Sequence, residues 1–272
     1  MTDEEFRLLR DLITEYCGIY FAESFKYLVE RRLQPRLPVF DMMSFRDYYR
    51  MLKYGPERAR EFDEIVERVT TNETYFFREA YQLESLVDEI LPEVVKGKKP
   101  GDRVRLWSAG CSTGEEPYTL AMVTHEMRAL RELSTEVFGN DISRKVLKTA
   151  RAALYRESSF RQTEQRWIDR HFTRDGRIFK LNDDIKNRVT FGHLNLMDEA
   201  AMALMNNVDV IFCRNVIIYF SNEARAKLLE MFYKKLRPGG YLLLGHSESL
   251  INASTKFELV PLRHDIVYRR PL

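Results

Sequence analysis

The chain has 272 residues, of which 44% are hydrophobic and 31% are charged. These fractions are typical of globular proteins and argue against a disordered chain, while the length suggests one or two domains. The 43 basic and 41 acidic residues leave a net charge of +2, which is too balanced for nonspecific nucleic-acid binding through a general positive field.

The sequence predicts a cytoplasmic protein without direct membrane insertion. No apolar run reaches the roughly 18 residues that a membrane-spanning helix needs, and the N-terminus MTDEEFRLL lacks the basic start and apolar middle of a signal peptide. Cys17, Cys111 and Cys213 are too scattered for a disulfide framework or a zinc site, so reduced thiols and no metal are expected.

Residues 1–65 are predicted to form a small helical domain. Apolar residues recur at helical spacing, for example Phe6, Leu9 and Ile13. Pro35 and Pro38 should each end or kink a helix near their positions, so the helices are expected to be short. The remaining residues, 66–272, are assigned to a second domain.

In the second domain, helix signals alternate with short runs rich in Val, Ile, Leu and aromatic residues. This alternation predicts a doubly wound sheet of mostly parallel strands with helices on both faces. The predicted strands are Arg103–Ser108, Thr135–Asn140, Arg188–Gly192, Val208–Cys213 and Tyr241–Gly245.

The end of the chain and one internal segment depart from this alternation. Lys256–Pro261 and Ile266–Arg270 are predicted strands whose connection is too short for a parallel crossover, so they should pair antiparallel at the far end of the sheet. The turn signal Arg174–Gly176 predicts a small hairpin between the second and third sheet strands. We place an inserted β-subdomain at about residues 165–190.

The segment WSAGCSTGEEP, which begins with the last two residues of the first predicted strand, is typical of a ligand-binding turn before a helix. Gly110 and Gly114 allow a sharp turn and a close approach of the backbone to a ligand. Glu115 and Glu116 at the helix start would repel a pyrophosphate, and the pattern is not G-x-G-x-x-G. A cationic ligand group such as an ammonium or sulfonium fits better. Alternatively, both glutamates only complement the helix dipole.

Asp141 follows the second predicted strand. An acidic residue in this place commonly accepts hydrogen bonds from ribose hydroxyls. Alternatively, Asp141 caps the helix that starts near Ser143, and the two roles can coexist.

Two further segments carry candidate polar residues. Thr70–Arg78 is dense in hydrogen-bonding groups beside aromatics, although Thr70 and Glu73 also have the spacing of a capping box at a helix start. Arg214 and Asn215 follow a strand and should lie at the carboxyl edge of the sheet, where such sheets bind ligands. Their alternative is a solvated loop.

Tyr219 and its neighbours could equally be packing residues. Arg237–Gly240 is interpreted as a helix stop before a strand.

Together these stretches resemble the CheR family of chemotaxis-receptor methyltransferases, and the resemblance spans almost the whole chain. The matching segments are TTNETYFFR (70–78), WSAGCSTGEEPYTLA (107–121), NDIS (140–143), NL (195–196), IFCRNVIIYF (211–220) and LRPGGYLLLGHSE (236–248).

The resemblance implies a class I methyltransferase-like α/β fold that binds S-adenosyl-L-methionine, with a mostly parallel sheet, an antiparallel last strand, a helical domain in front and an inserted β-subdomain. Arg78 and Tyr219 are the implied catalytic residues. Glu116, rather than Glu115, would face the cofactor, and Asp141 would bind the ribose. The implied cofactor-binding residues are Asn72, Thr74, Arg78, Glu116, Asp141, Asn195, Leu196, Arg214 and Asn215.

The implied activity is protein-glutamate O-methylation of chemoreceptors, which yields glutamate methyl esters and S-adenosyl-L-homocysteine for sensory adaptation. A glutamate side chain has a pKa of about 4.3 and is anionic at neutral pH, so in-line SN2 transfer requires no general base. The hairpin around Arg174–Arg177 is shorter than in family members that bind a receptor's C-terminal pentapeptide, which argues against that tether.

A basic stretch in the first domain could dock acidic receptor helices, through Lys26, Arg31, Arg32 and Arg36. Alternatively, this stretch is only a solvated helix face.

We expect the protein to be a monomer. Two rival functions are a nicotinamide-dependent oxidoreductase, disfavoured by the missing glycine motif, and a non-catalytic adaptor, disfavoured by the intact cofactor positions.

Overall fold

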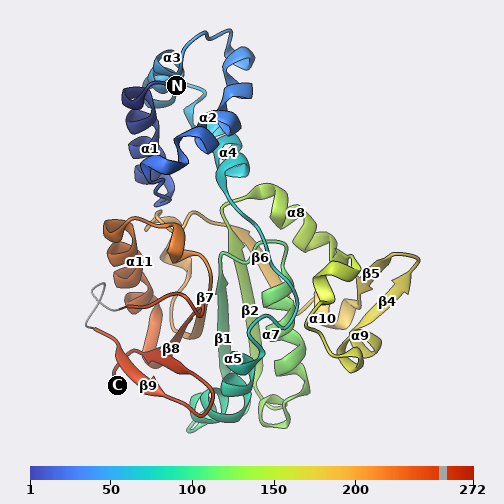
Figure 1. Ribbon diagram of the computed structural model, residues 1–272. Coiled ribbons are helices and arrows are strands. Elements are labelled where there is room, and N and C mark those ends of the chain that lie inside the picture. Colours follow the sequence, from blue (N-terminus) through green and yellow to red (C-terminus); the bar gives the residue numbers. More distant parts are fainter. Residues whose placement is uncertain (251–255) are drawn as a thin grey trace.

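A helical domain lies on top of an α/β domain in the computed structural model, which describes residues 1–250 and 256–272 (Figure 1). None of the described helices is long and apolar enough to cross a membrane. The main helices are α1 Asp3–Cys17, α2 Lys26–Leu33, α3 Phe45–Tyr54, α4 Arg58–Val69, α5 Ala80–Ser85, α6 Leu91–Val95, α7 Glu115–Glu126, α8 Arg144–Ala152, α9 Gln165–His171, α10 Asp183–Lys186 and α11 Asn222–Lys235.

Helices α1 to α4 form the helical domain, as the apolar spacing predicted. Thr2 and Glu5 make a reciprocal capping box at the start of α1, and Gly18 ends the helix in a left-handed conformation. The residues that predicted this helix, including Phe6 and Ile13, are buried in the domain core.

Among the described residues, seven strands form the main sheet in the order β6-β2-β1-β7-β8-β10-β9. The four pairs from β6 to β8 are parallel, and β10 pairs antiparallel with both β8 and β9, which confirms the predicted topology. The strands are β1 Arg103–Ala109, β2 Ser134–Asp141, β6 Val189–His193, β7 Val208–Cys213, β8 Leu236–Leu244, β9 Glu258–Pro261 and β10 Ile266–Arg269.

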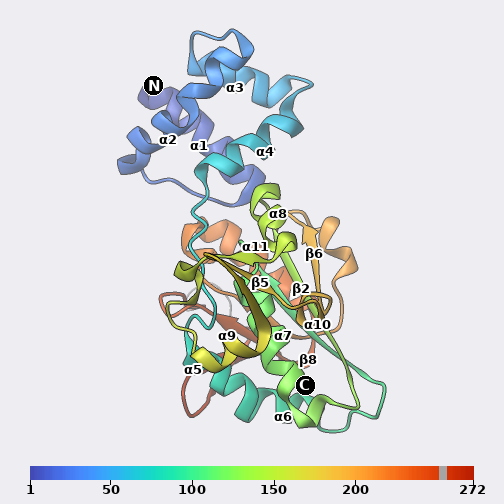
Figure 2. The same ribbon diagram turned by 90° about the vertical axis from the view of Figure 1, so that its right-hand side faces the viewer.

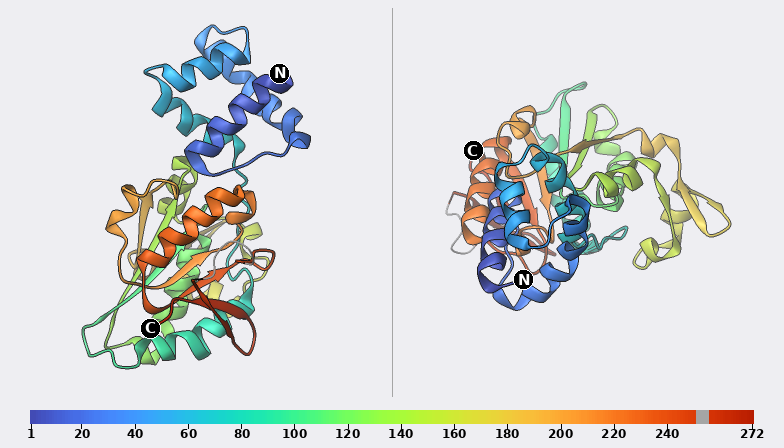
Figure 3. Two further views of the ribbon diagram at one scale, coloured as in Figure 1. Left: turned by 90° about the vertical axis from the view of Figure 1, so that its left-hand side faces the viewer. Right: turned by 90° about the horizontal axis from the view of Figure 1, so that it is seen from above.

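Both faces of the central strands are buried, because alternate side chains enter two different hydrophobic clusters. Trp107 and Ile211 pack in the cluster that contains α11, whereas Leu106 and Phe212 pack in the cluster that contains α7. Figure 3 shows α11, in orange, against one face of the sheet. The near-continuous apolar runs in the sequence are therefore the signature of a sheet covered on both sides.

Strand β8 starts earlier than predicted. We interpreted Arg237–Gly240 as a stop between a helix and a strand, and α11 does end at Lys235, but β8 begins at once with Leu236. The N–H of Gly239 donates to the Arg270 carbonyl at 2.9 Å, and the N–H of Arg270 donates to the Gly240 carbonyl at 2.8 Å. These bonds tie the Pro-Gly-Gly segment, where the register between β7 and β8 shifts and Gly239 has a φ of +74°, to the end of the chain.

A small antiparallel sheet, which lies between β2 and β6 in the sequence, projects from the side of the α/β domain (Figure 1) and faces the viewer in Figure 2. Its hairpin, β4 Phe172–Asp175 and β5 Ile178–Leu181, turns at the predicted Asp-Gly signal. A third strand, β3 Leu154–Tyr155, pairs with β5 and lies before the predicted 165–190 segment. Two residues are too few for a periodic strand signal.

The two domains are joined by specific contacts at the carboxyl edge of the main sheet. Ile19 and Phe220 form an antiparallel β-bridge. On the other side, the Glu67 carboxylate of α4 accepts the Ser143 hydroxyl at 2.7 Å and the Lys145 N–H at 3.0 Å, at the start of α8. The helical domain therefore covers the edge at which β1, β2 and β7 end (Figure 1).

Candidate active site

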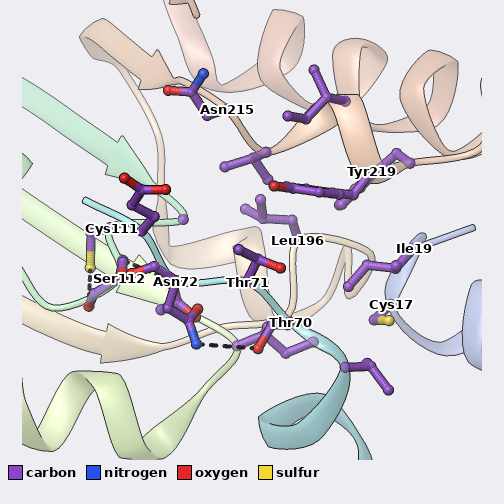
Figure 4. Close-up of a pocket in the computed structure, with 18 of the residues that line it drawn as sticks. Cys17, Ile19, Thr70, Thr71, Asn72, Cys111, Ser112, Leu196, Asn215 and Tyr219 are labelled. Atoms are coloured by element: carbon purple, nitrogen blue, oxygen red, sulfur yellow. Dashed lines mark hydrogen bonds between the residues drawn. The ribbon is translucent and has the colours of Figure 1, made fainter. Parts of the chain in front are cut away.

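A cavity of about 400 Å³ lies between the carboxyl ends of the central strands and the helical domain. Figure 4 shows Asn72 and Ser112 at one end, Cys17 and Ile19 at the other, and Tyr219 above the space between them. All sequence-predicted site residues line this one cavity: Asn72, Thr74, Arg78, Glu116, Asp141, Asn195, Leu196, Arg214, Asn215 and Tyr219.

The glycine turn after β1 is built as the sequence predicts. Gly110 and Gly114 have φ angles of +80° and +93°, in the left-handed region that favours glycine. A Cβ atom on Gly110 would lie 2.5 Å from the Val216 side chain, so no other residue fits without a shift. The N–H groups of Gly110 and Cys111 both donate to the carbonyl of Asn140, at 2.9 and 2.8 Å. The ends of β1 and β2 are thereby tied together at the cavity floor.

Glu116 does more than complement the helix dipole, because it forms an ion pair with the buried Arg214. Its Oε2 accepts Nε of Arg214 at 2.6 Å, and its Oε1 accepts the Ser108 hydroxyl at 2.6 Å. Arg214 also donates to the carbonyl of Arg78 at 2.7 Å and is buried. The alternative that Arg214 belongs to a solvated loop is therefore wrong.

Glu115 faces a different environment. Its carboxylate accepts the hydroxyls of Thr113 at 2.6 Å and Ser159 at 3.1 Å. Burial raises the pKa of this carboxyl above its usual value. Of the two adjacent glutamates, Glu116 is the one whose carboxylate borders the cavity.

Asp141 is buried at the end of β2, and its carboxylate is only partly used by the protein. It accepts the N–H of Ser112 and the N–H of Ser143, each at 2.9 Å. The N-cap of α8 is Ser143 itself, so the proposed capping role of Asp141 is wrong. Burial raises the pKa of Asp141 to about 6 despite these bonds. A carboxylate offers about four lone-pair sites, which leaves capacity for hydroxyl donors from a ligand.

The segment after α4 is extended rather than helical. Thr70 is the C-cap of α4, with its N–H bonded to Val66, so the capping-box interpretation of Thr70 and Glu73 is wrong. The Asn72 side chain donates to the Thr70 hydroxyl at 3.4 Å, and the Asn72 carbonyl accepts the Ser112 hydroxyl at 3.1 Å. These contacts lay the segment along the cavity wall.

Arg78 and Tyr219, the two residues for which the resemblance implies catalysis, come from different elements of the wall. The Nη1 of Arg78 donates to the Glu73 carbonyl at 3.1 Å. Tyr219 ends the short 3-10 turn Ile217–Tyr219, and the residue is 41% exposed. Tyr219 is therefore accessible from outside the cavity.

Two further predicted residues use their polar groups differently. Asn195 donates to the Tyr16 carbonyl at 2.6 Å and accepts the Met197 N–H at 2.9 Å, so its amide links the domains. Asn215 has a left-handed φ of +60°, and its buried Oδ1 has no hydrogen-bond partner in the described part of the chain. A buried unpaired acceptor beside a cavity is suited to a ligand donor.

Sequence reasoning gave no role to Glu248, although the family-like segment ending in GHSE contains it. Its carboxylate accepts four backbone N–H groups, from Gly245, Asn215, Val216 and Ile218, at 2.7 to 3.1 Å. This residue fixes the loop that carries Asn215 and leads to Tyr219. The sequence feature that could have pointed to Glu248 is its position as an acidic residue shortly after the end of a predicted strand.

The apolar end of the cavity was also missed. Cys17, Ile19, Phe25 and Leu28 of the helical domain line it. Apolar residues of this kind are equally expected in a domain core, so the sequence alone does not separate core from cavity wall.

The residues present fit S-adenosyl-L-methionine. Its sulfonium suits the acidic side that Glu116 provides, its ribose hydroxyls suit the free capacity of Asp141, and an amino group can donate to the unpaired Asn215 oxygen. The apolar side chains supply the remaining contact area. Fold and cavity together define an S-adenosylmethionine-dependent methyltransferase.

Comparison with known proteins identifies the family of this methyltransferase. Residues 72–266 match the family described as CheR methyltransferase, SAM binding domain, and residues 4–70 match CheR methyltransferase, all-alpha domain. The chain therefore belongs to the CheR methyltransferase family and is an S-adenosylmethionine-dependent methyltransferase of chemotaxis.

Curated relatives align over nearly their whole length. Chemotaxis protein methyltransferase 2 of Vibrio cholerae is 36% identical over 273 residues, which cover 100% of this chain and 94% of the relative. The chemotaxis protein methyltransferase of Vibrio parahaemolyticus is 38% identical over 275 residues, which cover 99% and 98%.

Proposed function

We propose that the protein methylates glutamate side-chain carboxylates on the cytoplasmic helices of chemoreceptors, and that it acts in the cytoplasm as a monomer. The observation that carries the proposal is the composition of the cavity wall. Arg78 and Tyr219 border it, and among the described residues that line it none is a histidine. Such a wall suits an acceptor that arrives already ionised.

The acceptor chemistry follows from charge. A glutamate carboxylate is anionic at neutral pH, so no base has to remove a proton. The Arg78 guanidinium can hold it by charge-assisted hydrogen bonds, and Tyr219 can limit its direction of approach.

When bound, S-adenosyl-L-methionine would supply an electrophilic methyl carbon, whose in-line transfer to a carboxylate oxygen would form a C–O bond, break the C–S bond and leave a neutral thioether. The residues of this chain contribute position. Holding two reactants in line accounts for about 7 to 11 kcal/mol of barrier lowering in well-oriented systems. Asp141, Asn215 and Glu116 would hold the methyl donor, and Arg78 the acceptor.

Three of the four basic residues proposed to contact the receptor are already paired within the protein. Lys26 pairs with Asp3 at 2.6 Å, Arg36 pairs with the buried Glu61, and Arg32 donates to the Val69 carbonyl at 2.8 Å. Arg31 is exposed, with no ion pair or hydrogen bond to the described residues. Arg31 is thus the best candidate of the four for a receptor contact.

The test is transfer of tritiated methyl groups to receptor-containing membranes from the same organism. A carboxyl methyl ester hydrolyses in mild alkali and releases volatile methanol, whereas N-methyl groups are stable. We expect alkali-labile label on the receptor, lost when the accepting glutamates are replaced by alanine and lost with Arg78→Ala enzyme. Alkali-stable label, or full label with Arg78→Ala, would refute the proposal.

A further inference from the structure

Arg161 lies outside the cavity wall, but it contacts the segment that carries Arg78. It follows the short 3-10 turn Glu157–Phe160, between β3 and α9. Its guanidinium carbon lies 3.8 Å from the centroid of the Tyr75 ring, which is the distance of direct stacking. Its Nη2 also donates to Oε1 of Glu73 at 2.7 Å.

Arg78 uses the same two residues. Its Nη1 donates to the backbone carbonyl of Glu73 at 3.1 Å, and its guanidinium lies 5.5 Å from the centroid of the Tyr75 ring. Glu73 therefore contacts Arg161 through its side chain and Arg78 through its carbonyl, while the Tyr75 ring is shared by both guanidinium groups.

The neighbouring backbone is fixed by different, buried contacts. Phe76 stacks on Phe160 with ring centroids 5.1 Å apart, and its N–H donates to the Ser159 carbonyl at 2.9 Å. Phe77 packs against Trp167 with ring centroids 4.9 Å apart. Residues 76 and 77 are thus anchored by Ser159, Phe160 and Trp167, without Arg161.

Within the described part of the chain, Glu73 and Tyr75 make no ring–ring contact or backbone–backbone hydrogen bond of this kind. Glu73 is exposed and Tyr75 is half-buried. Exposed ion pairs contribute little to folding free energy, and the Arg161 and Glu73 side chains are 44% and 70% exposed. The contacts of Arg161 therefore restrict the position of Glu73 and Tyr75 rather than stabilise the fold.

We propose that Arg161 is a positioning residue that holds Arg78, through Glu73 and Tyr75, in the orientation that meets the acceptor carboxylate. The inference rests on the acceptor role given to Arg78 in the proposed function. It also gives the segment ahead of the inserted subdomain a part in positioning the site, because Arg161 extends from that segment to Glu73, which lines the cavity.

The test compares Arg161→Ala and Arg161→Lys with the wild-type protein. Misplacement of a reacting group by about 1 Å lowers rates by up to about 100-fold, so we expect kcat for receptor methylation to fall between about 10- and 100-fold with Arg161→Ala. The Kd for S-adenosylhomocysteine and the thermal midpoint should stay as in the wild type. Lysine keeps the ion pair but loses the planar stacking of guanidinium, so Arg161→Lys should rescue only part of kcat.

The matched control is Arg166→Ala. Arg166 is an exposed arginine in the same region that stacks on Trp167 and pairs with Glu164. In the described part of the chain, Arg166 makes no contact with Tyr75, so Arg166→Ala should leave kcat unchanged.

A double-mutant cycle then separates positioning from direct action. If Arg161 acts through Arg78, adding Arg161→Ala to an Arg78→Lys enzyme should lower kcat less than twofold further. If the kcat losses of the two substitutions multiply in the double variant, the proposal is overturned. It is also overturned if Arg161→Ala keeps the wild-type kcat, or if its loss of kcat is accompanied by weaker cofactor binding and a lower thermal midpoint. The wild-type reaction run in parallel reports on the proposed function itself: without ester formation there, both the function and the inference fall.

Discussion

The backbone N–H of Tyr20 donates to the carbonyl of Tyr219 at 2.8 Å, and so connects the helical domain directly to the turn that carries a candidate catalytic side chain. A second bond runs from the Ser221 N–H to the Gly18 carbonyl at 3.0 Å. Tyr219 is therefore positioned from the helical domain, while its ring remains partly exposed beside the cavity. The helical domain completes the site as well as covering it.

Tyr219 should act through its ring rather than its hydroxyl. Because the acceptor is already ionised, no proton transfer is needed, and we expect Tyr219→Phe to keep kcat within about threefold of wild type. Tyr219→Ala removes the surface that limits the approach and should lower kcat about 100-fold. Steady-state methylation assays measure both. A loss in Tyr219→Phe as large as in Tyr219→Ala would show instead that the hydroxyl takes part.

The ion pair between Glu116 and Arg214 should be essential for stability. The Arg214 side chain is only 4% exposed, so Glu116→Gln leaves a buried charge with Glu79, at 3.6 Å, as its remaining carboxylate partner among the described residues. Breaking such a pair costs about 3 kcal/mol of unfolding free energy. Urea unfolding of Glu116→Gln should show this loss, and adding Arg214→Met should restore part of it. An unchanged urea midpoint in Glu116→Gln would show that the ion pair does not stabilise the fold.

Cofactor affinity should depend on pH through Asp141. Burial raises the pKa of this carboxyl to about 6 in the free protein, and ribose hydroxyls donate best to the ionised form. Affinity for S-adenosylhomocysteine should therefore be highest above pH 6 and should fall by up to about tenfold per unit below it. Titrations from pH 5 to 8 measure this, with Asp141→Asn as the control that has no such dependence. Equal affinity of the wild-type protein at pH 5 and pH 8 would contradict the role.

The same carboxyl affects stability with the opposite sign. Its pKa is raised in the folded state, so its contribution to the unfolding free energy is fully present below the unfolded pKa of about 4 and is lost as pH rises through about 6. In the ligand-free protein, Asp141→Asn should therefore become more stable relative to wild type as pH rises from 4 to 7. A constant difference between the two would argue against the raised pKa.

The basic residues of the helical domain should separate into two classes. Arg36 donates Nε to Glu61 at 2.7 Å, and Glu61 also accepts the buried Tyr48 hydroxyl, so Arg36→Ala should lower the unfolding free energy by about 3 kcal/mol. Arg31→Glu should leave stability unchanged and weaken receptor binding. Co-sedimentation with receptor membranes and urea unfolding test the two together. Full receptor affinity in Arg31→Glu would remove this face from the docking model.

Sequence patterns were most informative where local chemistry decides the structure. The buried strand Val208–Cys213 was predicted to the residue, because an apolar run covered on both faces has few alternatives. Gly110 and Asp141 were placed together because the ends of adjacent parallel strands meet at one edge of the sheet.

Features that depend on distant partners were missed. The early start of β8 requires bonds between Gly239, Gly240 and Arg270, and no local signal reports them. The cavity wall formed by Ile19 and the ion pair between Arg36 and Glu61 likewise arise only when separate helices pack. Local spacing predicts that such residues are buried, but not what they face.

The measurement that tests the central claim most directly is calorimetric titration of the purified protein with S-adenosylhomocysteine and, separately, with NAD. The cavity bordered by Glu116, Asp141 and Asn215 should give saturable one-to-one binding of S-adenosylhomocysteine, strongly weakened by Asp141→Ala, and no binding of NAD. Absence of saturable heat with S-adenosylhomocysteine, or binding unaffected by Asp141→Ala, would contradict the account.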